Sequence, residues 1–223
     1  MLFTLMLVAS IIVVSGAPPP PSQHHVTIGF VTSQIPDATL AEELVWLKAN
    51  RDAVDTVSAT SYRFNVSADA DAGGTAVVLD QWPTGANMSQ DEVTAAVHAL
   101  GMRTLPFVWE DDASGVPASY CNSTHPAGCC RLGRCLLTRL RALAANATVR
   151  ATLIAQLVAT AVQQAHAGYI LDFETHQAVL PADNAAFAVF ARELKVALTA
   201  RGKVLQIGVS PGKPIYDMVG AVR

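Results

Sequence analysis

The stretch GYILDFE, residues 168–174, indicates both the fold and the site of this protein. It is a short apolar run, typical of a buried strand, that carries two carboxylates near its C-terminal end. Side chains two positions apart on a strand share a face, so we expect Asp172 and Glu174 to point the same way. Burying two like charges side by side is costly unless a site uses them. The alternative is that both carboxylates only mark the point where the strand surfaces, one of them capping the next helix.

Strand-like and helix-like segments alternate along the rest of the chain. Strands are expected at 26–32, 54–62, 103–110 and 204–210, and helices at 38–50, 89–100, 136–165 and 183–201. Ser89 and Glu92 have the spacing of a capping box. We expect the third helix to break near Asn146 and the apolar run 75–80 to form a small hairpin. This alternation predicts parallel strands connected by helices.

Two architectures fit such an alternation, an open doubly wound sheet and a (β/α)8 barrel. No glycine-rich phosphate loop follows the first expected strand, and carboxylates at the C-terminal end of a strand suit a barrel. The sequence therefore predicts an α/β fold of the (β/α)8 TIM-barrel type. A full barrel has eight units in roughly 200–250 residues, whereas we expect about five βα units in these 223 residues. We therefore expect an incomplete barrel: a truncated gene model, a fragment or a splice form.

The N-terminal residues indicate export. Residues 1–16 carry no charged side chain, and their apolar run is too short to span a membrane, so they predict a signal peptide. A proline-rich spacer at 17–25 and a barrel domain at 26–223 would follow. An uncleaved anchor is the alternative. The expected location is extracellular, or the lumen of the secretory or lysosomal pathway, with no membrane partner after cleavage.

Cysteines and glycosylation sequons agree with this location. The four cysteines lie in one segment, at Cys121, Cys129, Cys130 and Cys135. In an oxidising compartment they predict two disulfides within a single loop, the adjacent pair bonding outward to the other two. Four sequons predict N-glycosylation at Asn65, Asn87, Asn122 and Asn146. Zinc is disfavoured at the cysteines because no histidine lies at a useful spacing.

Charge excludes one class of partner. The formal net charge is −3 and no basic stripe occurs, which argues against nucleic-acid binding. We expect a monomer without a cofactor or metal. One metal alternative stays open, because His176 has the same parity as Asp172 and Glu174, and the three side chains would converge if the strand continued. His24 and His25 would then be candidate fourth ligands.

Residues 146–176 resemble the family-18 glycoside hydrolases, which include chitinases, di-N-acetylchitobiase and chitinase-like lectins. A helix that starts from an Asn-containing turn leads into the strand, as in that family. Gly168, Asp172, Phe173 and Glu174 match the family pattern D-G-x-D-x-D-x-E, in which an aromatic residue commonly precedes the glutamate. The likeness is looser over 26–110 and 203–216, where it rests on the order of the elements.

The resemblance implies roles for the two carboxylates. Glu174 matches the general acid that protonates the glycosidic oxygen, and Asp172 matches the residue that orients the 2-acetamido group of the substrate. That acetamido oxygen is the nucleophile in this family. Trp109, Glu110 and Tyr169 are the expected substrate-binding residues. Trp109 would stack on a sugar or, equally, fill the core, and Glu110 would place a further carboxylate near Asp172.

The chain also departs from the family pattern. Ala167 and Ile170 stand where the pattern has its first two aspartates, and the strand over 104–110 lacks the S-x-G-G signature. The tyrosine of the sixth strand and the tryptophan of the eighth have no counterpart. Three functions therefore stay open: a secreted glycosidase that cleaves β-1,4-linked N-acetylglucosamine glycans, a catalytically silent glycan-binding relative, and a nonfunctional fragment.

Overall fold

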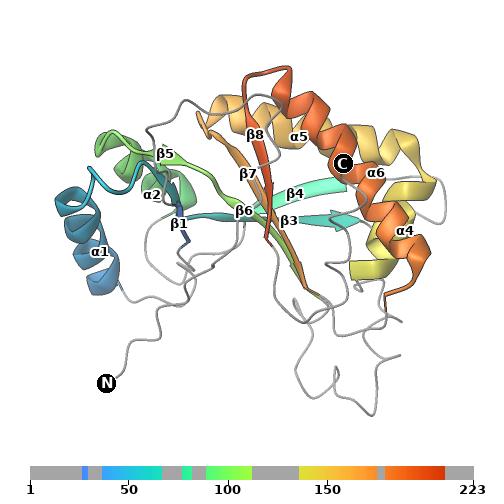
Figure 1. Ribbon diagram of the computed structural model, residues 1–223, viewed down its shortest axis with the longest axis horizontal. Helices are drawn as coiled ribbons and strands as arrows, with labels where there is room; N and C mark the ends of the chain where they lie inside the picture. The colour runs from blue at the N-terminus through green and yellow to red at the C-terminus, as the bar shows by residue number, and fades with distance from the viewer. Residues whose placement is uncertain are drawn as a thin grey trace, which may run out of the picture.

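The computed structural model describes residues 27–29, 37–66, 77–81, 89–111, 136–174 and 179–208. Strands form a curved sheet that is flanked by two groups of helices, α1 with α2 and α4 with α5 and α6 (Figure 1). In chain order the elements are β1 (Thr27–Gly29), α1 (Asp37–Ala49), β2 (Thr56–Ser58), β3 (Ser61–Val66), β4 (Val77–Gln81), α2 (Gln90–Ala99), β5 (Arg103–Thr104), β6 (Phe107–Asp111), α4 (Leu136–Ala145), α5 (Ala147–Gln163), β7 (Gly168–Glu174), α6 (Pro181–Thr199) and β8 (Val204–Ile207).

The parallel strands follow one another across the sheet in chain order. β1 pairs with β2, and β2 with β5. β3 pairs with β6, β6 with β7, and β7 with β8. Because β2 leads directly into β3 and β5 into β6, the two ladders are the N-terminal and C-terminal halves of the same strands. The described residues therefore contain five parallel strands connected by helices, as the sequence predicted.

The second parallel strand is interrupted between β2 and β3. Thr56 pairs with Arg103 and Ser61 with Phe107, so the second strand uses one more residue than its neighbour between the same two pairings. An extra residue of this kind is a β-bulge. It switches the alternation of side chains, so both halves keep their apolar residues on the helix side. The expected hairpin is present, because β4 pairs antiparallel with β3.

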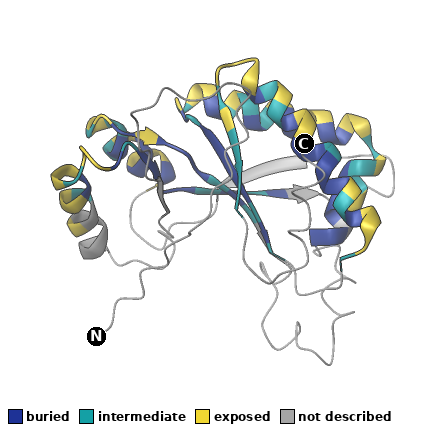
Figure 2. Ribbon diagram, viewed as in Figure 1, coloured by how far each residue is buried: buried dark blue, intermediate teal, exposed yellow. Residues whose placement is uncertain are grey.

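The main core lies between the sheet and the helices α4, α5 and α6. From β7, Leu171 and Phe173 are almost completely buried in it. The Phe173 ring stacks on Phe190 at 6.3 Å and meets the edge of Phe187 at 5.5 Å between centroids. Burial of each such side chain stabilises the fold by about 1.5–3 kcal/mol. Figure 2 shows the buried residues on the strands and on the helix sides that face them.

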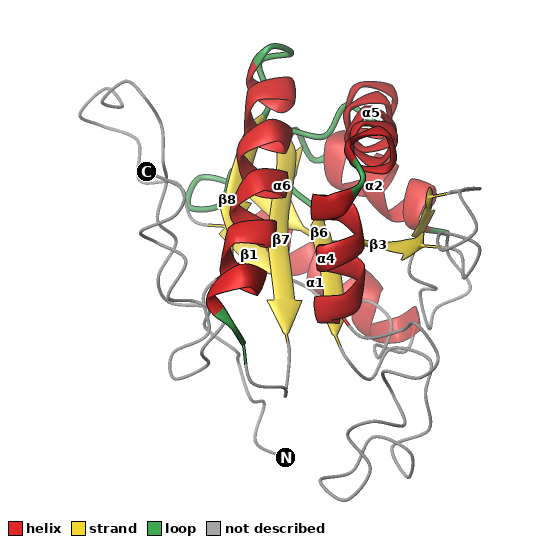
Figure 3. Cartoon of the chain, turned by 90° about the vertical axis from the view of Figure 1, so that its right-hand side faces the viewer, coloured by secondary structure: helices red, strands yellow, loops and turns green. Residues whose placement is uncertain are grey.

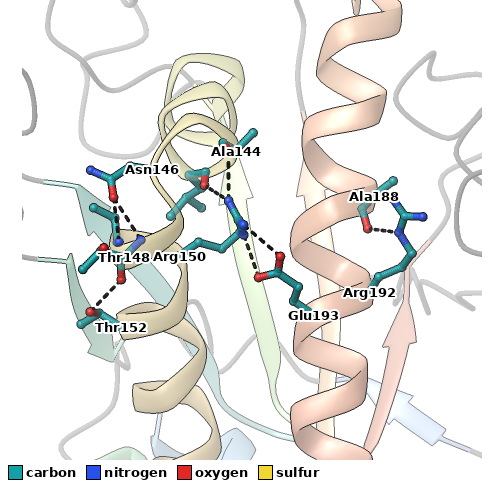
Figure 4. Close-up of polar contacts among 10 residues, drawn as sticks. Ala144, Asn146, Thr148, Arg150, Thr152, Ala188, Arg192 and Glu193 are labelled. Atoms are coloured by element: carbon teal, nitrogen blue, oxygen red, sulfur yellow. Dashed lines mark hydrogen bonds and ion pairs between the residues drawn. The ribbon is translucent and has the colours of Figure 1, made fainter.

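Local signals set the helix ends where the sequence predicted them. Ser89 caps α2, its hydroxyl accepting from the Glu92 amide while the Glu92 carboxylate accepts from the Ser89 amide at 2.6 Å. Asn146 ends α4 and caps α5, its side-chain oxygen accepting from the amides of Thr148 and Val149 at 3.1 Å (Figure 4). The predicted break of the long helix at Asn146 is therefore confirmed. Within the described residues no single helix is long and apolar enough to cross a membrane, although Arg139–Ala145 and Ala147–Gln163 reach those criteria together across a 109° bend.

Two arginines hold the outer helices together over β7. The buried Arg150 guanidinium of α5 donates to Glu193 of α6 at 2.8 and 2.9 Å, and also to two main-chain carbonyls at the end of α4 (Figure 4). Arg141 of α4 donates to Asp183 of α6. Figure 3 shows α4 and α6 in front of β6 and β7, on the face of the sheet that they cover. These contacts hold the helices that cover the helix side of β7.

Candidate functional site

Asp172 and Glu174 lie on the face of β7 that is turned away from the helices, which we call the inner face. Their neighbours Leu171 and Phe173 belong to the helix-side core, and side chains alternate along a strand. Both carboxylate residues are half-buried. The structure thus brings the two together on one face, at the C-terminal end of their strand. In a parallel sheet of barrel type this is the edge that carries the chemistry.

Trp109 of β6 is the residue beside Asp172. The register pairs these two positions directly, and neighbouring strands lie about 4.8 Å apart. Val108, its neighbour on β6, is fully buried in the helix-side core, which places Trp109 on the inner face. Trp109 is half-buried rather than enclosed in the core. It therefore remains a substrate-binding candidate.

Glu110, expected to bring a carboxylate near Asp172, is not the residue that the register pairs with it. Glu110 pairs with Phe173, whereas Asp111 pairs with Glu174. A shift of one residue moves a strand position to the other face of the sheet. The sequence gives the parity of β6 by itself but not its alignment with β7, so it could not choose between Trp109 and Glu110 as the neighbour of Asp172.

Tyr169, expected to bind substrate, lies in the core and not on the inner face. Tyr169 is fully buried on the helix side, and its hydroxyl donates to the Leu157 carbonyl of α5 at 2.9 Å. Burial, with a smaller contribution from Tyr62, raises the pKa of this phenol. Its parity is opposite to that of Asp172 and Glu174, and its hydrogen bond ties the strand to α5. Tyr169 is therefore a core residue.

β8 supplies the other neighbours of the carboxylates. Gly208 donates its amide to the Leu171 carbonyl at 2.8 Å. A Cβ atom at Gly208 would lie 3.3 Å from the Asp172 Oδ1 atom, so the carboxylate rests against the backbone of this glycine. Gln206 pairs with Ile170, which is only 6% exposed and brings a hydrocarbon to the inner face. The structure thus leaves an apolar residue at the position where the family pattern has an aspartate.

A buried polar network that sequence reasoning missed lies on the helix side. The Thr104 hydroxyl lies 2.8 Å from His166 Nδ1 and 3.0 Å from His98 Nε2, and the Tyr62 hydroxyl lies 2.9 Å from His166 Nε2. Burial first, then the nearby His98 and Lys203, lowers the pKa of His166 to about 4. Burial and Lys203 also lower the pKa of His98. Its members come from separate elements, so no sequence motif indicates them. The network lies on the opposite face of the sheet from the two carboxylates.

Several sequence predictions fall outside the described residues. They concern the signal peptide 1–16, the spacer 17–25, the metal alternative through His24, His25 and His176, the sequons at Asn87 and Asn122, and the disulfides of Cys121, Cys129, Cys130 and Cys135. Of the other two sequon residues, Asn65 lies in β3 and Asn146 caps α5. Across the described ranges no group of three His, Cys, Asp or Glu side chains could hold a metal ion.

Neither a protein-family model nor a curated protein matches this sequence, but several solved structures do. The chain is similar to a class V chitinase from Pseudomonas fluorescens Pf-5, with 21% identity and a TM-score of 0.51 over 82% of this chain and 47% of that one. The chain is also similar to a chitinase from Chromobacterium violaceum ATCC 12472, with 18% identity and a TM-score of 0.49 over 81% of this chain and 43% of that one. The spore cortex-lytic enzyme SleL of Bacillus megaterium QM B1551 has 18% identity to this chain and a TM-score of 0.49, over 85% of this chain and 35% of SleL.

At these identities the likeness shows the fold alone. The chain spans less than half the length of each of the three structures. Together with the order of the parallel strands, the likeness to the first of them shows that the described residues form part of a (β/α)8-type barrel. The predicted fold class, an incomplete barrel of the TIM type, is confirmed.

Proposed function

We propose that this protein is a secreted glycoside hydrolase that cleaves β-1,4-linked N-acetylglucosamine glycans by substrate-assisted, retaining catalysis. The observation that carries the proposal is the placement of Asp172 and Glu174 on the inner face of a parallel, barrel-type sheet, at its C-terminal edge. The resemblance of residues 146–176 to family-18 glycosidases supports the same reaction. The glycan would be the only partner of a monomeric protein that needs no cofactor.

Glu174 would act as general acid and then as general base. In the first step its protonated carboxyl gives a proton to the glycosidic oxygen as the bond to the sugar breaks. In the second step the carboxylate takes a proton from the attacking water. Glu174 is the last residue of β7 and is half-buried, so a bound sugar could reach it from the edge of the sheet.

Asp172 would orient the nucleophile, which belongs to the substrate. The acetamido oxygen attacks the anomeric carbon, and Asp172 accepts a hydrogen bond from the acetamido N–H, stabilising the cyclic intermediate. Trp109, directly beside Asp172 in the register, would stack on the apolar face of the sugar. Because the nucleophile comes from the substrate, two carboxylates on one strand suffice for this mechanism.

The test is the release of a fluorophore from chitobiose and chitotriose glycosides. Glu174→Gln should lower kcat by about 10²–10⁴-fold, the usual contribution of a general acid, while the glycan still binds. Glu42→Gln changes an exposed glutamate of α1 and serves as the matched control. Equal rates in the wild type and Glu174→Gln would rule out Glu174 as the acid.

A catalytically silent glycan-binding protein is the second candidate. It is favoured by Ile170, which is buried on the inner face where a carboxylate could otherwise support Asp172. Chitotriose binding without turnover, in a sample that unfolds in one cooperative transition, would select this function. A sample without such a transition would support the nonfunctional fragment.

A further inference from the structure

Gln206 occupies the inner face of β8 close to the proposed catalytic aspartate. It pairs with Ile170, and Asp172 is the next inner-face residue of β7 after Ile170. The residues on either side of Gln206, Leu205 and Ile207, pack against the helix-side core, so alternation turns Gln206 inward. The side chain of Gln206 therefore lies beside that of Ile170, on the same face as Asp172.

The amide oxygen of Gln206 is a buried acceptor without a partner. Among the described residues no donor lies within hydrogen-bonding distance of it. The Ser58 hydroxyl, also on the inner face because Val57 faces the helices, is likewise buried without a partner in the described part of the chain. Leaving a buried acceptor unpaired costs stability, so natural proteins seldom keep one without a use. A donor that arrives with a ligand would satisfy this oxygen.

Asp172 restricts the kind of ligand donor that can pair with the Gln206 amide oxygen. Its Oδ1 atom lies toward β8, where a Cβ atom on Gly208 would be 3.3 Å away. The carboxylate of Asp172 and the side chain of Gln206 thus both lie on the inner face, where β7 adjoins β8. In the proposed mechanism Asp172 takes the acetamido N–H of the sugar. The donors that remain on that sugar are its hydroxyl groups.

We infer that Gln206 is a substrate-binding residue, whose amide oxygen accepts a hydrogen bond from a hydroxyl of the sugar held by Asp172. The inference rests on the proposed function and adds a specificity determinant to it. Glutamine is neutral, so it can accept from a hydroxyl without adding a third charge beside Asp172 and Glu174. A methionine at this position would keep the shape of the side chain and remove the acceptor.

The test compares chitotriose affinity with stability in the full chain. Gln206→Met should weaken chitotriose binding, measured by titration calorimetry, by about three- to tenfold, the range of one neutral hydrogen bond. Because the substitution removes an unpaired buried acceptor, the unfolding temperature should stay the same or rise. Gln163→Met changes an exposed glutamine of α5 and should alter neither quantity.

The outcomes separate this inference from the function on which it rests. Affinity equal to that of the wild type overturns the role of Gln206 alone, as does a loss of affinity that comes with a lower unfolding temperature, since a structural residue would give that result. A wild-type chain that folds but binds no N-acetylglucosamine oligomer overturns the proposed function and this inference with it. Weaker binding at undiminished stability supports both.

Discussion

Acid should destabilise this protein through His166. The imidazole is fully buried, and its two nitrogens face the hydroxyls of Tyr62 and Thr104 at 2.9 and 2.8 Å. Burial, reinforced by the positive charge of Lys203 and by His98, lowers the pKa of His166 to about 4, while Asp91 opposes the shift. A proton on the ring would give a buried cation beside another cation. The folded protein therefore keeps this ring neutral.

The sign and size of the effect follow from proton linkage. An unfolded histidine has a pKa of about 6.5. Between that value and about 4 the unfolded chain holds a proton on residue 166 that the folded chain does not. Stability is therefore fully present above about pH 6.5 and is lost as the pH falls toward 4. At about 1.4 kcal/mol for each pKa unit, the loss is roughly 3 kcal/mol, a large share of the 5–15 kcal/mol that is usual for a domain.

The assay is urea unfolding, followed by circular dichroism, at several pH values between 7.5 and 4. The variant His166→Gln can still hydrogen-bond to both hydroxyls but does not titrate. Other titrating groups are common to the two proteins, so the difference in their pH dependence isolates His166. The wild type should lose roughly 3 kcal/mol more than the variant between pH 7.5 and 4. Parallel pH profiles for the two proteins would refute the reasoning.

Two further predictions concern the framework around the site. Gly168→Ala should lower the free energy of unfolding by at least about 3 kcal/mol, measured by urea unfolding, because Gly168 has a φ of +155° and an added Cβ would lie 1.8 Å from the Val204 carbonyl oxygen. Gly202 has a φ of +65° but lies in open space, so Gly202→Ala should cost only about 1 kcal/mol. Similar costs for the two glycines would contradict the close approach of β7 and β8. Arg150→Met should cost about 2 kcal/mol because it leaves two main-chain carbonyls unpaired. Glu193→Gln removes only the half-exposed partner of Arg150 and should cost under about 1 kcal/mol. A larger loss of thermal stability in Glu193→Gln than in Arg150→Met would contradict this account.

The fold explains why a glycine stands at position 168 of the motif. In the sequence it is one of the matches to the family-18 strand pattern. In the structure it lets β8 approach β7 at the start of both strands. The match at Gly168 therefore supports the fold, whereas the proposed chemistry rests on Asp172 and Glu174.

The sequence by itself determined the features that depend on neighbours along the chain. Alternation within β7 placed Asp172 and Glu174 on one face, because this property needs only two positions of a strand. The capping box of Ser89 and the helix break at Asn146 are equally local, since a side chain there bonds to backbone two or three residues away. The order of such elements was sufficient to predict parallel strands of barrel type.

Only the tertiary structure decided which distant residues meet. The register of β6 against β7, which put Trp109 rather than Glu110 beside Asp172, depends on hydrogen bonds between strands that lie far apart in the chain. The core position of Tyr169 depends on a helix carbonyl, and the protonation of His166 depends on burial by several elements together. These outcomes arise from packing among segments whose alignment no local pattern encodes.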